Sequence, residues 1–325
     1  MAGFLARRLG AAGLVAFGVV TLTFLLIHLA PGSPLAGPAE NPYVSREMIE
    51  QARRNFALDQ PLYFQYVRYL ANLARGDWGT SYAMHRPVLD ALGDALPNTL
   101  VLALAALILD FTLGIAIGTL QGMRAHSTLD RVCSAVTLTL YSVPVFWLGL
   151  MLVLLLGQPL GWLPVGGVVD PVLYATRGVL GKMLDRAAHL ALPALTLGLV
   201  GAAGTARYQR AAVLEVSRQD FIRTARAKGL SEPAVALRHA LRNALLPTIT
   251  LLGLSLPTLF SGAVLVETVF SWPGMGRLAV EAVLRRDYPM VTGAAILVAF
   301  AVVAGNLVAD LLVRLADPRT REAAS

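Results

Sequence analysis

Long apolar stretches alternate with polar segments along the whole chain. Six of them are candidates to cross a hydrocarbon layer of about 30 Å at about 1.5 Å per helical residue, although the fourth is short. Their bounds are Ala11–Ala30, Leu100–Gly122, Val132–Leu156, Leu190–Ala206, Leu245–Phe270 and Val291–Leu315. This pattern predicts an all-α polytopic membrane protein with six transmembrane helices and a long external segment between the first and second helices.

Prolines interrupt three of these stretches. Pro144 lies in the middle of the third, Pro193 near the start of the fourth, and Pro257 within the fifth. Because proline removes a helical hydrogen bond and clashes with the preceding turn, we expect a kinked third helix and a broken fourth helix. The carbonyl groups freed by a kink need a bundle interior or a cavity, so Pro144 and Pro257 are candidates for a translocation pathway.

Polar segments divide the chain into parts. We expect the N-terminus and first transmembrane helix over 1–30, an external segment over 31–97, a five-helix core over 98–320 and a tail over 321–325. Within the external segment, Leu62–Ala74 predicts an amphipathic helix, because its aromatic and aliphatic residues share one helical face.

Composition and charge give the predicted topology. Hydrophobic residues make up 56% of the chain, and the mean hydropathy is +0.63. The chain has 27 Lys and Arg against 20 Asp and Glu, and the excess lies in the loop 207–242 and at the termini. Because Lys and Arg favour the cytoplasmic side, we expect both termini and this loop to be cytoplasmic. The positive charge then needs no nucleic acid to explain it, and the predicted surroundings are a lipid bilayer.

Few residues suggest catalysis or metal binding. The single cysteine, Cys133, excludes an internal disulfide, and the five histidines are too scattered for a metal site. The sequence also lacks a glycine-rich phosphate-binding loop. We therefore expect that this chain is not an enzyme and that it has no catalytic, cofactor-binding or metal-binding residues.

One acidic residue lies inside an apolar stretch. Asp110 is near the middle of the second stretch, where a carboxylate is costly unless it faces the protein interior. A hydrogen-bonded helix contact is the simpler interpretation, and a place on a translocation pathway is the alternative.

The basic loop predicts two short helices around a turn. Phe221–Lys228 contains good helix formers, and Gly229 after it suits a C-terminal cap with positive φ. Ser231 can cap the next helix, with Glu232 in its first turn. The loop therefore carries a short helix on the predicted cytoplasmic side.

A resemblance to a known family begins in this loop. The run Thr224–Gly229, with the sequence TARAKG, resembles the EAA loop of the permease subunits of ABC importers. Residues 223–225 differ from the Glu-Ala-Ala consensus, and Pro247 lies further from Gly229 than the consensus proline does. Both departures are similar to the dipeptide/oligopeptide/nickel branch of that family.

The resemblance to this branch extends from Pro31 to Arg319. Its other motifs are Asp59–Leu62, Arg75–Ser81, Gly161–Gly167, Glu267–Arg277, Arg286–Pro289 and Asp317–Arg319. It implies a type I ABC importer permease fold in the bacterial cytoplasmic (inner) membrane. The implied partners are a second homologous permease, two cytoplasmic ATPase subunits that bind ATP and Mg, and an external substrate-binding protein; the implied substrates are dipeptides or oligopeptides.

The resemblance also implies that the loop 207–242 is a coupling loop, which docks on an ATPase. The implied coupling residues are Phe221, Ile222, Arg223, Thr224, Ala225, Arg226, Ala227, Lys228, Gly229 and Leu230. The spacing of Phe221, Ile222 and Ala225 places them on one helical face, which we expect to enter a groove on the ATPase. We expect the basic side chains to pair with acidic residues at the rim of that groove.

Two alternatives stay open at this point. The chain could be a proton-coupled secondary transporter with Asp110, Glu267 and Asp310 as proton carriers, although only Asp110 lies near the middle of a stretch. The same ABC machinery could also import nickel complexes or glutathione-like peptides.

Overall fold

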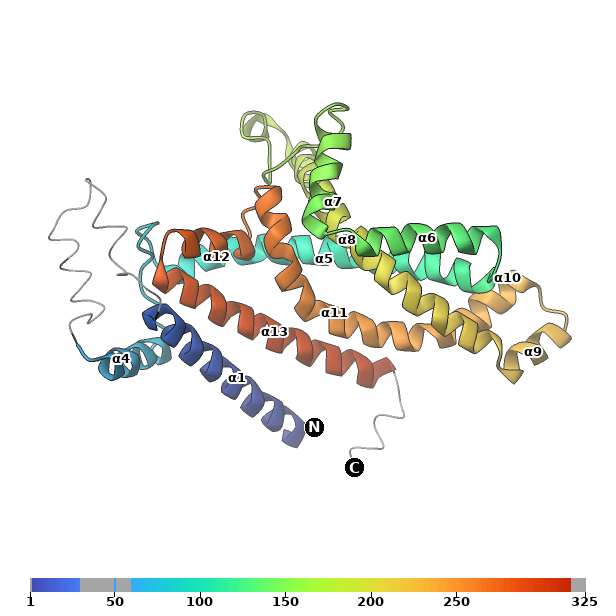
Figure 1. The fold of residues 1–325 in the computed structure, drawn as a ribbon, viewed down its shortest axis with the longest axis horizontal. Coiled ribbons are helices and arrows are strands. Elements are labelled where there is room, and N and C mark those ends of the chain that lie inside the picture. Colours follow the sequence, from blue (N-terminus) through green and yellow to red (C-terminus); the bar gives the residue numbers. More distant parts are fainter. Residues whose placement is uncertain (1, 30–49, 51–59, 317–325) are drawn as a thin grey trace. The chain divides into compact units, whose positions relative to one another are not determined.

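The computed structural model describes residues 2–29, 50 and 60–316, and within them the regular elements are helical (Figure 1). A single β-bridge joins Thr80 to Pro87. The longer helices are α1 (Ala2–Leu29), α4 (Leu62–Ala74), α5 (Val88–Met123), α6 (Thr128–Ser142), α7 (Val145–Leu152), α8 (Val179–Ser217), α9 (Asp220–Ala227), α11 (Leu241–Val269), α12 (Met275–Leu284) and α13 (Tyr288–Ala316). Short turns of helix are α10 (Glu232–Ala234), π-helical turns over Val153–Gly157 and Val235–Ala240, and a 3-10 turn over Tyr174–Thr176.

The helices account for all six predicted apolar stretches. Among the described residues, α5, α8 and the Tyr288–Val308 part of α13 are each long and apolar enough to cross a membrane. The α6–α7 pair passes the same test as one broken span. The first predicted stretch lies in α1, whose described apolar part is Gly13–Leu26, and the fifth lies in α11. The prediction of an all-α polytopic membrane protein is therefore confirmed, and so is the amphipathic helix α4 with its predicted bounds.

The structure differs from the expectations for two prolines: the bend at Pro144 is larger than a kink, and the expected break at Pro193 is absent. At Pro144 the chain does not merely kink: Val143 and Pro144 are both extended, and α6 and α7 meet at 105°. Pro193, by contrast, is buried inside α8, which continues for 39 residues without a break. In the early part of α8, Asp185 accepts hydrogen bonds from Arg177 (2.8 Å) and from the Asp170 amide (2.9 Å). The helix can therefore begin well before the apolar stretch that predicted it.

The described chain divides into two compact units. The first comprises residues 1–97 and 277–301. Here the ring of Phe24 in α1 packs on Tyr66 and Tyr69 of α4, at centroid distances of 5.1 and 5.7 Å. Asp287, just before α13, accepts hydrogen bonds from the Ser81 hydroxyl and from the Ala83 amide (3.1 Å). One buried carboxylate thus fixes the loop before α5 to the start of α13.

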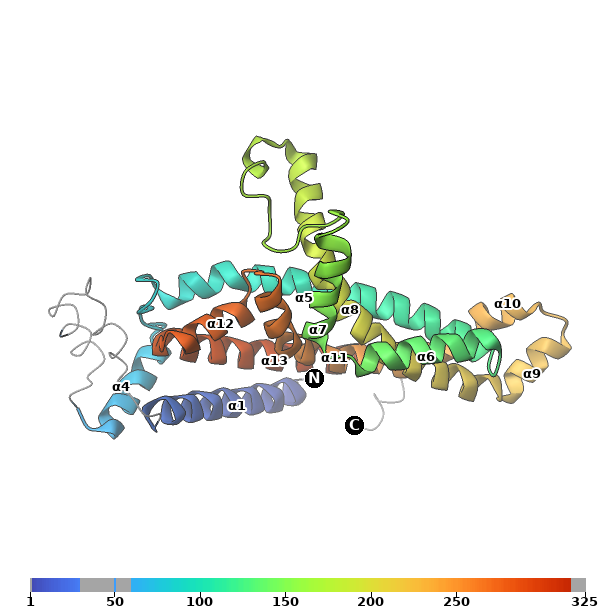
Figure 2. The same ribbon diagram turned by 45° about the horizontal axis from the view of Figure 1, so that its top comes forward.

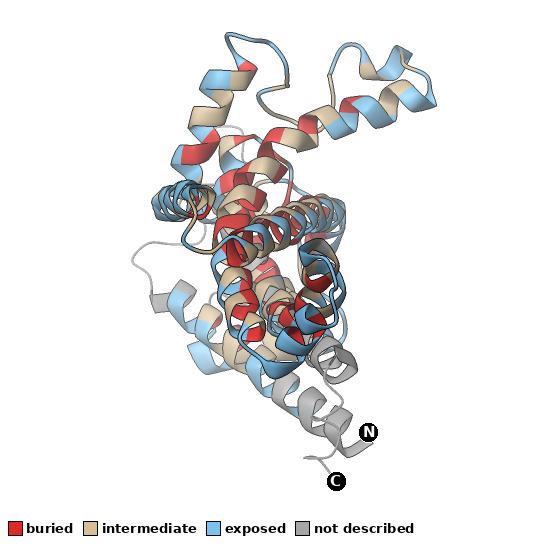
Figure 3. Cartoon of the chain, turned by 90° about the vertical axis from the view of Figure 1, so that its right-hand side faces the viewer, coloured by how far each residue is buried: buried red, intermediate tan, exposed pale blue. Residues whose placement is uncertain are grey.

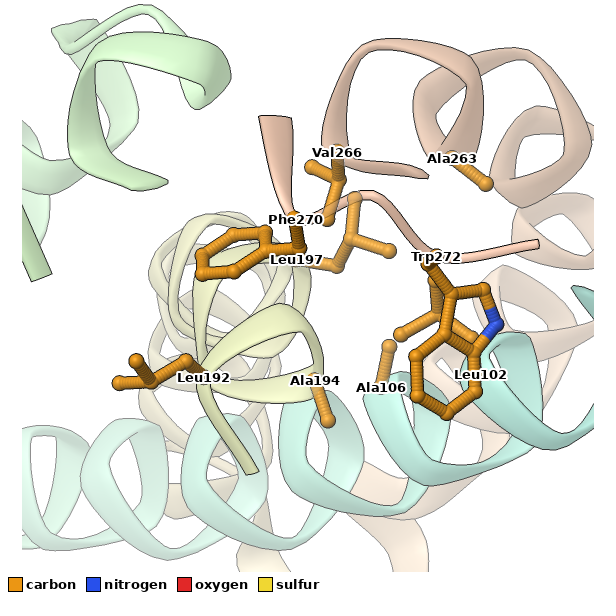
Figure 4. Packing of buried hydrophobic residues seen from close by; sticks show 9 residues of the cluster. All are labelled: Leu102, Ala106, Leu192, Ala194, Leu197, Ala263, Val266, Phe270 and Trp272. Atoms are coloured by element: carbon orange, nitrogen blue, oxygen red, sulfur yellow. The ribbon is translucent and has the colours of Figure 1, made fainter. Parts of the chain in front are cut away.

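The second unit comprises residues 98–276 and 302–325. Its apolar core brings together three helices, α5, α8 and α11, with the turn that follows α11 (Figure 4). The cluster consists of Leu102, Ala106, Leu192, Ala194, Leu197, Ala263, Val266, Phe270 and Trp272. The Trp272 indole N–H donates to the Asn98 carbonyl at 3.0 Å, so the largest ring in the cluster leaves no unpaired polar atom.

Many helices are covered on one side only. Buried and exposed positions alternate along them (Figure 3), and large apolar side chains such as Leu104 and Ile108 are 60% and 56% exposed. An exposed apolar surface of this kind is costly in water, whereas a bilayer solvates it. This surface therefore supports placement of the helices in lipid.

A line of glycines brings α5 and α8 into close contact. A Cβ atom on Gly114 would lie 2.6 Å from the Thr205 Cβ, and one on Gly122 would lie 2.6 Å from the Val213 Cγ1. Between them, a Cβ on Gly118 would overlap the Ala206 carbonyl oxygen. The spacing of four residues puts all three glycines on one face of α5, which is the small-residue packing typical of membrane helices.

We predict that Gly118→Ala destabilises the protein by about 1–3 kcal/mol, because the added methyl group must push two backbones apart. Gly93→Ala is the matched control in the same helix, since a Cβ there meets nothing within 4 Å. It should be neutral or stabilise by about 0.5–1 kcal/mol. Thermal unfolding of the purified protein in detergent measures both changes, and equal melting temperatures for the two variants would contradict this account of the α5–α8 contact.

Candidate coupling site

The loop between the end of α8 and the start of α11 carries the candidate coupling residues. Both Figure 1 and Figure 2 show α9 and α10 at the end of α8 that lies away from α7. The helix α9 begins at Asp220, one residue earlier than predicted, and ends at Ala227. Gly229 follows with φ +76°, as the sequence predicts, and its amide donates to the Arg226 carbonyl at 2.9 Å. Since a Cβ at this glycine meets nothing within 4 Å, the requirement for glycine is conformational.

The inner face of α9 is buried against its own chain. The sequence predicts that Ile222 and Ala225 enter a groove on a partner, but their exposed fractions are 0% and 5%. They belong to an apolar cluster with Ala212, Val213, Val216, Val235, Ala240 and Ala244. The prediction of a groove contact is therefore wrong for both residues, because the end of α8 and the start of α11 already cover this face. Their contribution is to hold α9 in place.

The outer face of α9 is open to solvent. Phe221 in α9 and Leu230 just after it are each 39% exposed. Arg223, Thr224, Ala227 and Lys228 are exposed beside them. This apolar pair flanked by cations is a candidate surface for binding another protein, and we call Phe221, Arg223, Thr224, Lys228 and Leu230 the docking surface.

A bidentate ion pair braces the turn at Gly229. The Arg226 guanidinium donates to both carboxylate oxygens of Glu232, at 2.8 and 3.2 Å. Arg226 therefore lowers the pKa of Glu232 below its usual range, and the pair is lost only as pH falls through that lowered value. The expectation that Arg226 pairs with an acidic residue of a partner is not what this structure shows. Sequence reasoning missed the pairing because a positive-φ turn brings residues six apart together.

The three candidate pathway residues have different surroundings where the structure describes them. Asp110 is buried, 7% exposed, and accepts a hydrogen bond from Thr205 of α8 at 2.6 Å, so the prediction that it faces the interior is confirmed. Pro144 lines an open depression of about 530 Å³ at the break between α6 and α7, together with Leu138, Thr139, Ser142, Val143 and Trp147. Pro257 falls within the bounds of α11, but its side chain lies outside the described residues.

Two further acidic residues were possible proton carriers. Glu267 is fully buried and accepts a hydrogen bond from the Thr99 hydroxyl at 2.6 Å. The side chain of Asp310 lies outside the described residues. Among the described residues, no group of His, Cys, Asp and Glu is arranged to hold a metal ion. Asp110 and Glu267 thus each make a helix contact in this structure.

These features define an α-helical integral membrane protein with one extended polar loop that presents a helix. The family model described as binding-protein-dependent transport system inner membrane component matches residues 114–322, and the model of its N-terminal part matches residues 1–103. The chain therefore belongs to this family, the permease subunits of ABC importers.

Relatives in several bacteria align over nearly the whole chain. It is 43% identical to a di/tripeptide transport system permease protein of Pseudomonas aeruginosa, with 99% of each chain covered. It is 39% identical to an oligopeptide transport system permease protein of Bacillus subtilis (98% and 99% covered) and 37% identical to a glutathione transport system permease protein of Escherichia coli (94% of each). These relatives place the chain in the dipeptide/oligopeptide branch.

A solved structure shares the fold. The inward-facing MetNI methionine ABC transporter aligns with a TM-score of 0.55 at 20% identity, over 70% of this chain and 97% of that chain. At this identity the likeness supports the type I permease fold alone. It agrees with the fold that the sequence motifs imply.

Proposed function

We propose that this chain forms half of the translocation pathway of an ATP-driven peptide importer and that α9 couples it to a cytoplasmic ATPase. The observation that supports the coupling role is that one face of α9 is buried in its own chain while the other is exposed. Its inner face is fixed by Ile222 and Ala225, while its outer face exposes Phe221 and the turn after it exposes Leu230. A helix attached in this way transmits a displacement to α8 and α11 instead of bending independently.

The proposed partners follow from membership of the permease family. They are a second homologous permease, two ATPase subunits that bind ATP and Mg, and an external substrate-binding protein. Closure of the ATPases moves α9, and with it the attached ends of α8 and α11. The bundle then changes between two arrangements that the partner biases, which is the energetic requirement for alternating access.

The break at Pro144 supports a place on the pathway. It interrupts an apolar span, and Thr139 and Ser142 supply hydroxyl groups to the depression beside it. Backbone that is not helical is tolerated at membrane depth only where protein or a water-filled cavity surrounds it. Asp110 is proposed instead as a packing residue, and Pro257 stays a sequence prediction for the pathway.

We predict that Phe221→Asp weakens binding of the ATPase by about 2 kcal/mol, or roughly 30-fold, because a charge replaces the apolar centre of the docking surface. Gly229→Val should also weaken it, through about 1–2 kcal/mol of backbone strain at φ +76°. Gly229→Asn is the matched variant at that position, since Asn tolerates positive φ. Co-elution of ATPase with the purified permease measures the effect.

Tyr63→Asp controls for introducing a charge at an exposed aromatic residue, since Tyr63 is 73% exposed and lies in α4. It should leave ATPase co-elution unchanged. If Phe221→Asp and Gly229→Val also co-elute normally, α9 is not the docking element.

We further propose that both termini and the coupling loop are cytoplasmic and that the segment 31–97 is external. Single cysteines at Arg75 and Ser231, in a chain with Cys133 replaced, should react with a membrane-impermeant reagent from opposite sides. Both positions are exposed, whereas Ser81 is only 1% exposed and would label poorly. Labelling of both cysteines from the same side would contradict the proposed topology.

The proposed substrates are dipeptides or oligopeptides, and this step rests on the names of the relatives. Deletion of the chain should abolish uptake of labelled di- and tripeptides by whole cells, and the restored gene should recover it. Glutathione and nickel complexes belong in the same panel, since one relative is named for glutathione. Uptake of those compounds alone would redirect the substrate assignment without changing the coupling proposal.

A further inference from the structure

Two buried polar contacts meet at consecutive residues of α8. Gln209 and Arg210 lie about two helical turns before α8 ends at Ser217. Gln209 is fully buried, and Arg210 reaches a buried carboxylate. Neither residue belongs to the docking surface.

Arg210 ties α6 and the preceding turn to α8. Its guanidinium donates to both oxygens of Asp130, at 2.8 Å each, and Asp130 is only 3% exposed. The same carboxylate accepts the amide of His126 at 2.9 Å, a residue with φ +64° in the turn between α5 and α6. One ion pair therefore fixes the orientation of α6 and the shape of the turn that leads into it.

Gln209 connects α5 and α11 to α8 at the position next to Arg210. Its amide oxygen accepts the Thr248 hydroxyl of α11 at 2.5 Å, and its amide nitrogen donates to the Thr119 hydroxyl of α5 at 3.2 Å. Thr248 is 1% exposed, so this contact is shielded from solvent. Gly118, next to Thr119, permits the close approach of the two backbones that the contact needs.

These contacts add direction to the apolar packing, because hydrogen bonds and ion pairs hold only over a narrow range of angles. A buried ion pair contributes little net stability compared with apolar residues of the same size, but breaking it leaves a buried charge without a partner. Hydrogen bonds from α8 to α5, α6 and α11 at one level also constrain rotation and sliding of these helices. The apolar cluster under α9 begins at Ala212, only two residues beyond Arg210.

We propose that Gln209 and Arg210 are positioning residues that join the ends of α5, α6, α8 and α11 into one body, which moves together with α9. The inference rests on the proposed coupling function. It identifies the residues through which a displacement of α9 is passed to α5, α6 and α11. It predicts that loss of either contact leaves ATPase docking intact and lowers the amount of substrate moved per ATP hydrolysed.

The test uses the complete transporter in proteoliposomes, with transport and ATP hydrolysis measured on the same preparation. Arg210→Gln should lower the ratio of transport to hydrolysis by about tenfold, within the range of typical coupling free energies. Arg210→Lys keeps the charge but loses the bidentate geometry and should give an intermediate ratio. Thr248→Val, which keeps the shape and removes the hydrogen bond to Gln209, should lower the ratio as well. Arg131→Gln removes a charge from an exposed neighbour of Asp130 and should leave the ratio unchanged.

The outcomes separate this inference from the docking proposal. ATPase co-elution should stay normal in the Arg210 and Thr248 variants, while Phe221→Asp loses it. Lower yield or melting temperature with an unchanged ratio in the assembled complex would show a merely structural role and overturn the inference. An unchanged ratio in both Arg210→Gln and Thr248→Val would overturn it equally. If Phe221→Asp keeps normal co-elution, the docking proposal fails instead.

Discussion

The distance between α5 and α8 is set by the missing side chains of three glycines, and much of the second unit depends on it. Gly114, Gly118 and Gly122 let α5 approach the backbone of α8 more closely than any residue with a Cβ would permit. In a bilayer the hydrophobic effect gives little drive for helix association, so such close packing and the hydrogen bonds that it permits must supply the attraction. The Asp110–Thr205 and Thr119–Gln209 contacts both bridge this pair of helices.

Three buried carboxylates in the described helices each join two helices. Asp110 joins α5 to α8, Asp130 joins α6 to α8, and Glu267 joins α11 to α5 through Thr99. An unpaired carboxylate at such positions would be costly, so each partner restricts how its helices can move. Two of these carboxylates, Asp110 and Glu267, suggested a proton-coupled transporter from sequence alone, together with Asp310. Membership of the ABC permease family and the contacts made by Asp110 and Glu267 account for them without proton transfer.

Features with a local cause were predictable from the sequence, and features that depend on neighbouring helices were not. The apolar stretches, the bounds of α4 and the positive φ of Gly229 follow from composition, periodicity and the lack of a Cβ. Pro144 and Pro193 have the same local effect, yet one ends a helix and the other lies within a helix of 39 residues. The local pattern around each proline does not distinguish these outcomes, because they depend on packing against residues that are distant in the sequence. The glycines on α5 do carry a signal, a spacing of four residues, which becomes informative once the partner helix is known.

The coupling loop shows why an amphipathic pattern identifies a buried face but not what buries it. The sequence gives Phe221, Ile222 and Ala225 similar positions around α9, and a groove on another protein could in principle cover all three. The chain itself covers Ile222 and Ala225, and the ring of Phe221 stays partly exposed. This division has a mechanical consequence. A helix whose inner face is packed into the ends of α8 and α11 cannot be displaced without moving them, so in the proposed coupling a force on its exposed surface would reach the long helices directly. A helix that used its whole apolar face to bind the partner would have more contact area with it. Such a helix would pass less of its displacement to α8 and α11.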